Sequence, residues 1–311
     1  MKRTFSLTYL LLTSLFISLF ISSCQKEKSL DGNLETQASM ASSESDAEAE
    51  IIFNDVFDNT IGVNDDVGMA GTGVFGRSAT GDPYGNNTAA RPDSVRCFTI
   101  TVTRLTSAPF PVRIVINFGT TGCVGRDGRV RKGKIIIEYT NRLIQPGAVA
   151  TTTFDGFYID NIKVEGTHRI SNTSTVNVNR QFTVDVINAK LTKPNGNFTE
   201  WESHKVITQI EGLGTPLFPL DDIFKIEGSA SGNAKRGTLL VAWQSTITVP
   251  LIKKFNCRWI VEGRVRTVRI NNNTNSPWIA ILDFGNGNCD NQATITINGV
   301  THQITDRKSV V

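Results

Sequence analysis

The sequence predicts an all-β fold: a long-stranded antiparallel meander, as a curved sheet or a sandwich, with one short N-terminal helix before it. Apolar and polar residues alternate over 176–186 and again over 239–249, a period of two that buries one face of a strand. Turn-forming residues at 160–161, 193–197 and 298–299 separate apolar runs and favour hairpins between neighbours. Several candidate strands exceed ten residues, which favours a wide curved sheet or two packed sheets.

A short motif of an apolar residue, a glutamate and a glycine recurs within the candidate strands. Glycine inside a strand usually marks a bulge or a bend. The copies are unevenly spaced, which excludes the fixed period of a solenoid. We therefore expect bends in related strands at Val164-Glu165-Gly166, Ile210-Glu211-Gly212, Ile226-Glu227-Gly228 and Val261-Glu262-Gly263.

One helix is expected ahead of the sheet. Ser43 or Ser45 can cap its start, and apolar residues fall at helical spacing over 52–57. The helix should end near Gly62. Its apolar face should dock on the sheet, because a short exposed helix is marginal alone. Residues 68–94 are rich in Gly, Asn, Thr and Ala and predict a loose linker.

The N-terminus has the layout of a bacterial lipoprotein signal. An apolar run over residues 5–21 is too short to span a membrane and ends in Ile21-Ser22-Ser23-Cys24, which matches a lipobox. We expect residues 1–23 to be removed as a signal peptide and Cys24 to carry a lipid anchor. Gln25 favours the outer membrane of a Gram-negative cell, on either its periplasmic or its surface face. The alternative is a cleaved secretory signal without lipid.

Charge divides the mature chain. Residues 24–50 hold seven acidic and two basic residues, and their Ser/Ala/Glu/Asp composition predicts a solvated acidic tether. Residues 51–94 would then hold the helix and flexible linker, and residues 95–311 the β domain. Residues 51–311 carry 28 basic and 22 acidic residues, an excess too small to indicate nucleic acid as a partner.

Basic residues cluster in one predicted hairpin. They could meet the phosphates of a lipid or a polysaccharide. No aromatic residues lie between them, so a solvated Gly-rich hairpin loop is the favoured interpretation. The cluster comprises Arg126, Arg129, Arg131, Lys132 and Lys134.

Five cysteines become four once Cys24 carries lipid, and an even number in an exported chain indicates disulfides. Four cysteines allow three connectivities, and an internal duplication favours one of them. An apolar strand, an Asn or Asp and then F-G-x3-C occur at 115–123 and again at 281–289, each with one cysteine upstream. We expect disulfides Cys97–Cys123 and Cys257–Cys289. A four-thiol metal site is disfavoured, because the sequence has no C-x2-C motif or Cys/His cluster.

No spacing typical of a catalytic or cofactor motif is present, so we assign no catalytic residue, metal or cofactor. One weak signal for glycan contact is Trp201 between Glu200 and Glu202. Two carboxylates on one strand face stand roughly 7 Å apart, which suits acid/base work across a sugar bond. A solvent-facing strand edge with lysine partners is favoured instead, since nothing predicts a cleft or a raised pKa. The remaining tryptophans are more often core residues than sugar platforms: Trp243, Trp259 and Trp278.

The lipobox, the acidic segment and the repeated F-G-x3-C together resemble a group of uncharacterised Gram-negative outer-membrane lipoproteins. The resemblance covers residues 97–139, 154–170 and 257–304. It implies a shared extracytoplasmic β domain and supplies neither an activity nor catalytic residues.

These observations favour a lipid-anchored envelope lipoprotein with a non-enzymatic binding or structural role, attached to the membrane through Cys24 and contacting an envelope glycan or protein. A glycan-binding or carbohydrate-active surface protein is the first alternative. A periplasmic carrier of lipid or another apolar ligand is the second, and its mark would be a continuous apolar concave face.

Overall fold

The computed structural model describes residues 28–62, 97–125, 127–175, 179–215, 219–270 and 278–305. The predicted signal peptide, Cys24 and the predicted linker at 68–94 lie outside these residues. Contacts divide the chain into two units, Met1–Ala38 and Ser39–Val311. The second unit holds most of the helix together with the sheet.

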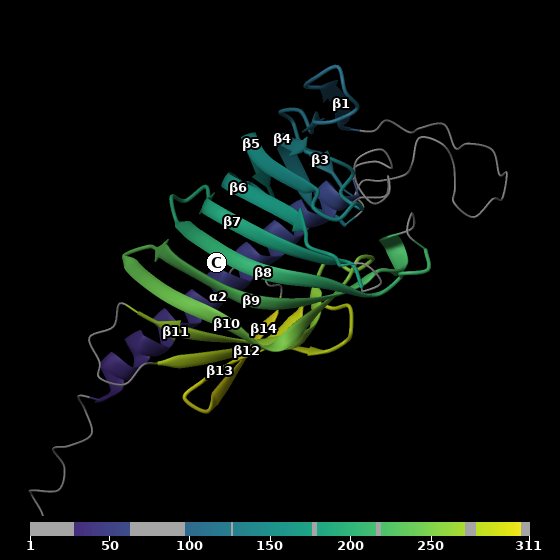
Figure 1. Cartoon of the computed structure of the whole chain (residues 1–311). Helices are drawn as coiled ribbons and strands as arrows, with labels where there is room; N and C mark the ends of the chain where they lie inside the picture. The colour runs from purple at the N-terminus through teal and green to yellow at the C-terminus, as the bar shows by residue number, and fades with distance from the viewer. Residues whose placement is uncertain are drawn as a thin grey trace, which may run out of the picture. The chain divides into compact units, whose positions relative to one another are not determined.

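The second unit combines one helix with a single sheet whose strands succeed one another in chain order (Figure 1). The elements are α2 (Lys28–Ile61), β1 (Thr99–Arg104), β2 (Val112–Asn117), β3 (Cys123–Val124), β4 (Val130–Tyr139), β5 (Val149–Ile159), β6 (Ile162–Asn172), β7 (Gln181–Thr192), β8 (Phe198–Glu211), a 3-10 turn (Pro219–Asp221), β9 (Ile223–Arg236), β10 (Leu239–Lys254), β11 (Ile260–Arg269), β12 (Ile279–Asn286), β13 (Gln292–Ile297) and β14 (Val300–Thr305).

The described strands form one 14-stranded antiparallel sheet, in which only β3 lies off the main path, paired with β4. This confirms the predicted long-stranded meander, as one curved sheet and not a sandwich. The predicted two-residue turns are present as left-handed residues: Asp160 and Asn161 join β5 to β6, and Asn298 and Gly299 join β13 to β14. Such turns match the twist of the strands that they connect.

Glycines bend the strands at three of the four predicted positions, whereas the fourth, Gly212, follows the last residue of β8 and lies outside the strand. Gly166, Gly228 and Gly263 all have positive φ angles inside strands, and the pairing register shifts at Gly166 and at Gly263. A Cβ atom on Gly263 would lie 2.5 Å from the carbonyl oxygen of Pro250 on β10. These positions therefore require glycine, and together they let long strands curl around the helix.

One residue of β10 that was predicted to face the interior is exposed to solvent. Val241 and Trp243 of β10 face the interior as expected, but Val249 is 39% exposed. The register between β10 and β9 shifts between Thr246 and Leu251, so Leu251 takes the buried position. Four residues of β10 oppose two of β9 across this shift, a bulge of two extra residues, after which Leu251 and Lys253 face the interior again like Trp243. The sequence alternation does not reveal the bulge.

Residues 39–61 of α2 run along the inner face of the sheet and are buried almost throughout (Figure 1). Phe53 stacks on Trp201, with ring centroids 5.6 Å apart, and Phe57 meets Phe182 and Phe224 edge-on. The helix ends at Ile61, with the Gly62 amide donating to the Asp58 carbonyl. The predicted apolar face and helix end are both present.

The start of the helix differs from the prediction. Helix α2 begins at Lys28, well before Ser43, so most of the segment expected to be a solvated tether is helical. From residue 39 to residue 50 this acidic segment is buried against the sheet. The physical reason is that its acidic side chains find basic partners on strands far along the chain, which local composition does not show.

Candidate functional site

Basic side chains of the sheet and of the β7–β8 turn pair with acidic side chains of α2. We call these basic residues, Arg131, Lys193, Lys205, Arg236 and Lys253, the helix seat. The pairs are Glu44–Arg236 at 2.9 Å, Glu48–Lys193 at 3.1 Å, Glu50–Lys205 at 2.8 Å, Asp58–Lys253 at 2.8 Å, and Asp55–Arg131. Removing one partner of a buried pair leaves the other charge buried without compensation, which is strongly destabilising. A helix displaced along the sheet would break all of these pairs, so they hold the helix in one register.

Asp46 has a different partner. Its Oδ1 accepts hydrogen bonds from Trp201 Nε1 at 2.8 Å and from Trp243 Nε1 at 3.0 Å. Gly232 of β9 lies in register between the two tryptophans, and a Cβ atom there would lie 2.7 Å from Cζ2 of Trp243. Glycine therefore leaves room for two indoles to converge on one carboxylate. Burial raises the pKa of Asp46, although Lys205 and the two indole hydrogen bonds oppose that shift.

Arg131 joins the helix to the segment just ahead of β4. Its side chain is fully buried, and it donates to Asp55 and, at 2.7 Å, to Asp127 Oδ2. Burial would raise the pKa of Asp127, but the hydrogen bonds from Arg131 hold it below the usual range. At the far end of the helix, burial raises the pKa of Asp58 to about 6, against the opposing charge of Lys253.

The predicted glycan residues lie on opposite faces of β8. Trp201 is 2% exposed and faces the helix, so its ring offers no face to a sugar. Glu200 and Glu202 point to the outer face, and Glu200 accepts a hydrogen bond from Lys190 at 2.9 Å. That bond lowers the pKa of Glu200, which favours the predicted strand edge with a lysine partner over a general acid. Because successive side chains of a strand point to opposite faces, strand geometry alone already separates Trp201 from Glu200 and Glu202.

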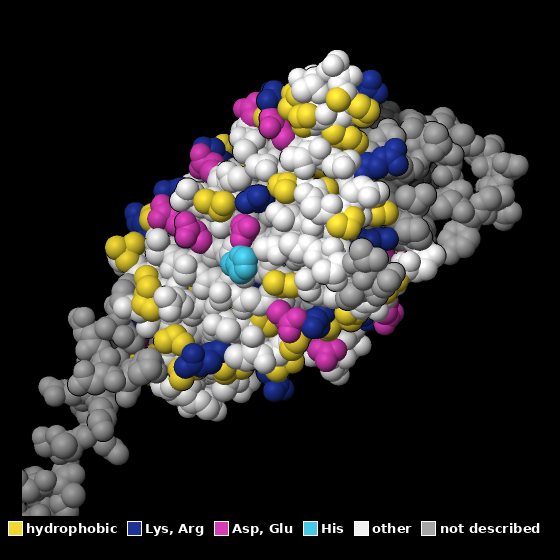
Figure 2. Space-filling model, viewed as in Figure 1, with side chains coloured by type: hydrophobic (Ala, Val, Ile, Leu, Met, Phe, Trp, Pro, Cys, Tyr) yellow, Lys and Arg dark blue, Asp and Glu magenta, His cyan; other side chains and the backbone are white. Residues whose placement is uncertain are grey.

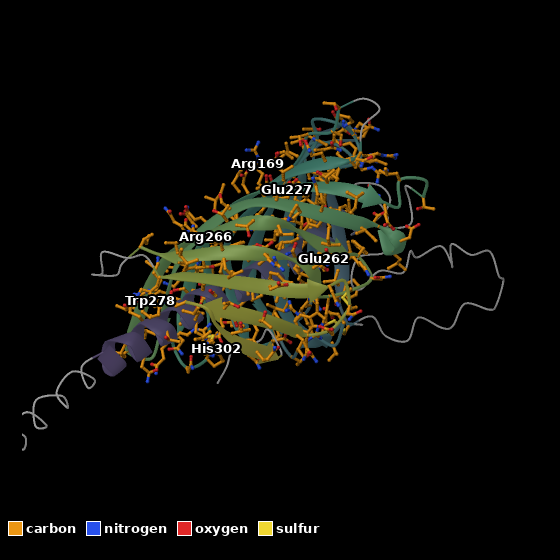
Figure 3. The ribbon with its side chains drawn as sticks, turned by 90° about the horizontal axis from the view of Figure 1, so that it is seen from below. Arg169, Glu227, Glu262, Arg266, Trp278 and His302 are labelled. Carbon is orange, nitrogen blue, oxygen red and sulfur yellow. A yellow bond between two sulfur atoms is a disulfide. The ribbon has the colours of Figure 1, made fainter. Side chains whose placement is uncertain are left out.

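Two of the three other tryptophans are core residues, as predicted. Trp243 and Trp259 are buried. Trp278, just ahead of β12, is half-buried; it is labelled in Figure 3 with Arg266, which lies on the neighbouring strand β11.

The outer face of β7–β10 is hollowed. Two adjoining depressions of about 500 and 570 Å³ share Glu202 and Ser231, and their floor carries small side chains such as Ser229 and Ala242. We call this the outer hollow. Nδ1 of His204 lies 2.6 Å from Oδ1 of Asp185 at its rim. Hydroxyl, carboxylate and imidazole groups there can exchange hydrogen bonds with a polar ligand.

Around the outer hollow, the outer face mixes charges of both signs (Figure 2). Cross-strand pairs join Arg113 to Glu138, Lys134 to Asp155 and Arg264 to Asp283. Such exposed pairs each contribute about 0–1 kcal/mol. The described part of this face therefore presents no strong field of one sign.

Both predicted disulfides are present, Cys97–Cys123 and Cys257–Cys289. The duplicated segments share a local geometry: the Asn117 side chain accepts from the Gly119 amide at 2.9 Å, and Asp283 accepts from Gly285 at 3.0 Å. Asn117 is the last residue of β2, and Asp283 lies three residues before the end of β12 at Asn286.

The predicted basic cluster does not form one surface. Arg129 and Arg131 are buried, whereas Lys134 pairs with Asp155 on the outer face at 2.8 Å. Arg126 lies outside the described residues. The two buried arginines face acids of the interior, so the solvated-loop prediction fails for them and the cluster presents no common face to a polyanion.

Sequence reasoning missed the helix seat. Lys205 shares its strand face with Trp201 and Ile207, so strand alternation placed a lysine among inward residues. A lysine at an inward position signals a buried acidic partner, and the acidic segment at 44–58 is the part of the chain able to supply one.

Comparisons of the chain with protein family models, with curated proteins and with solved structures found no match. Among the described residues, no three His, Cys, Asp or Glu side chains gather as a metal site. No helix in the described ranges is long and apolar enough to cross a bilayer.

Proposed function

We propose that this protein is a lipid-anchored lipoprotein of the outer membrane with a non-enzymatic binding or structural role. The observation that carries the proposal is the burial of residues 39–61 beneath the sheet, because the segment after the lipobox leads directly into the core of the β domain. A lipid on Cys24 would thus hold the folded domain itself.

The chain between anchor and core is short. Fourteen residues, 25–38, separate Cys24 from Ser39, the first residue of the second unit. Fully extended, they reach about 50 Å, and much less where they are helical. The sheet is therefore kept near the bilayer surface, where it would meet a partner embedded in or lying on the membrane.

Glycan binding is the second candidate, supported by the outer hollow. Glu202, Ser229, Ser231 and Gln244 supply acceptors and donors of the kinds that polyhydroxyl ligands use. In this proposal for glycan binding, Trp201 does not contact the glycan, because its side chain is buried against the helix. A carrier of apolar cargo has less support, because α2 occupies the inner face and buried charges line it.

Metabolic labelling with a radioactive fatty acid tests the anchor. Wild type should carry label and sediment with outer membranes, whereas Cys24→Ala should lose both properties. Label that persists in Cys24→Ala would contradict lipidation at this residue. Protease treatment of intact cells then assigns the face of the membrane on which the domain lies.

A polysaccharide panel tests the second candidate. Glu202→Gln should weaken glycan retention if the outer hollow is the site. Glu165→Gln, the matched change on β6 outside the hollow, should leave retention unchanged. Equal retention by wild type and Glu202→Gln would remove the glycan proposal.

A further inference from the structure

A second cavity, of about 170 Å³, lies beside the middle of α2. It forms where the β5–β6 turn, the β7–β8 turn, the start of β4 and the segment just ahead of β11 meet the helix. We call it the helix-side pocket. An engineered cavity of about 150 Å³ accepts benzene, so the pocket suits a ligand of roughly six to nine heavy atoms.

Arg129 brings unsatisfied donors to this pocket. It is 4% exposed, and its Nε and Nη1 atoms have no hydrogen-bond partner among the described residues. The nearest acid is Asp160, whose Oδ2 lies 3.7 Å from Nε, too far for a hydrogen bond. A buried guanidinium with open donors is costly unless a partner fills the site, and a carboxylate is the partner that it binds best.

Glu48 brings an unsatisfied acceptor. It is 4% exposed, and its Oε2 atom has no hydrogen-bond partner among the described residues. Lys193 Nζ lies 3.1 Å from Oε1 as an ion-pair partner. A carboxylate offers about four lone-pair sites, so Glu48 retains capacity for a second cation.

The remaining walls are apolar. Ile51, Ile159 and Trp259 are buried, and Ile162 is half-buried at the edge of the pocket. The four charged groups, Arg129, Lys193, Glu48 and Asp160, balance one another. A ligand with one net charge would leave that charge uncompensated in a buried site, whereas a ligand that carries both signs would not.

We propose that the helix-side pocket binds a small zwitterion, an α-amino acid with a branched apolar side chain. Its carboxylate pairs with Arg129, its ammonium group with Glu48, and its side chain packs on the isoleucines and Trp259. This goes beyond the proposed function, because the site lies within the folded domain and does not depend on the lipid anchor.

Calorimetric titration of the mature chain, residues 24–311 with Cys24→Ala for solubility, tests the proposal with three probes. L-valine carries both charges, 3-methylbutanoate lacks the amine, and 2-methylpropylamine lacks the carboxylate. L-valine should bind saturably, and each analogue should bind at least about tenfold more weakly, because each loses one charge-assisted contact. No saturable binding of L-valine, or equal binding of 3-methylbutanoate, would overturn the proposal.

Variants locate the binding. Arg129→Gln should weaken L-valine binding by about tenfold or more, while Arg113→Gln, the same change at an exposed pair, should not. Ile162→Phe fills the pocket from a half-buried position without removing a charge, and should abolish binding while the circular dichroism spectrum stays unchanged. Undiminished binding in Ile162→Phe would contradict this site. Fatty-acid labelling is a separate readout, so anchor and pocket can fail independently.

Discussion

Replacing Asp46 by alanine removes the acceptor that Trp201 and Trp243 share. Two indole N–H groups are then buried without a partner, at about 1–3 kcal/mol each. Burial raises the pKa of Asp46, so losing the carboxylate returns part of its desolvation cost. We therefore expect the free energy of unfolding to fall by about 2–4 kcal/mol, a large share of a domain's usual stability.

Urea unfolding monitored by tryptophan fluorescence measures this change, with two matched variants beside it. Asp46→Asn keeps an oxygen that accepts from both indoles and should cost about 1 kcal/mol or less. Asp155→Ala removes an exposed acid paired with Lys134 and should cost about 0–1 kcal/mol. If Asp46→Ala unfolds like Asp155→Ala, or if Asp46→Asn is as destabilising as Asp46→Ala, the shared acceptor does not stabilise the fold.

Other parts of the fold yield further predictions. Burial raises the pKa of Asp58 to about 6, so the folded chain binds this proton more tightly than the unfolded chain. The contribution of Asp58 to the free energy of unfolding should therefore drop by about 2 kcal/mol as the pH rises from 4 to 7. Asp58→Asn should flatten that slope in urea titrations, and an unchanged slope would refute the assignment. Thiol labelling of the denatured, unreduced mature protein should find no free cysteine at 97 or 123, and replacing both by serine should cost about 3 kcal/mol; free thiols would contradict the disulfide. Gly263→Ala should destabilise the domain by at least about 2 kcal/mol more than Gly237→Ala, because both have positive φ but only Gly263 faces a close backbone. Equal melting temperatures of Gly263→Ala and Gly237→Ala would show that the bend in β11 does not require glycine at position 263.

The sheet was predictable because its signals are local. A period of two, two-residue turns and the repeated glycine motif act between neighbouring strands, and a meander joins only neighbours. The disulfide pairing was predictable from a duplication visible in the sequence. The exposure of Val249 was not predictable, since it depends on a bulge in β10 where that strand pairs with β9.

The burial of the acidic helix was not predictable from its own composition. Ser, Ala, Glu and Asp favour solvation when they are considered alone. Their burial depends on Lys193, Lys205 and Arg236, which the strands bring to the helix from more than 140 residues along the chain. The glycan interpretation of Trp201 combined neighbours that strand geometry separates onto opposite faces.

Hydrogen exchange of the full mature chain, read by mass spectrometry, tests most directly whether the acidic segment is part of the core. We expect amides of residues 39–61 to be protected to the same extent as those of β8, because helix and sheet open together. Exchange of that segment within seconds, while β8 stays protected, would mean that residues 39–61 form a solvated tether outside the core.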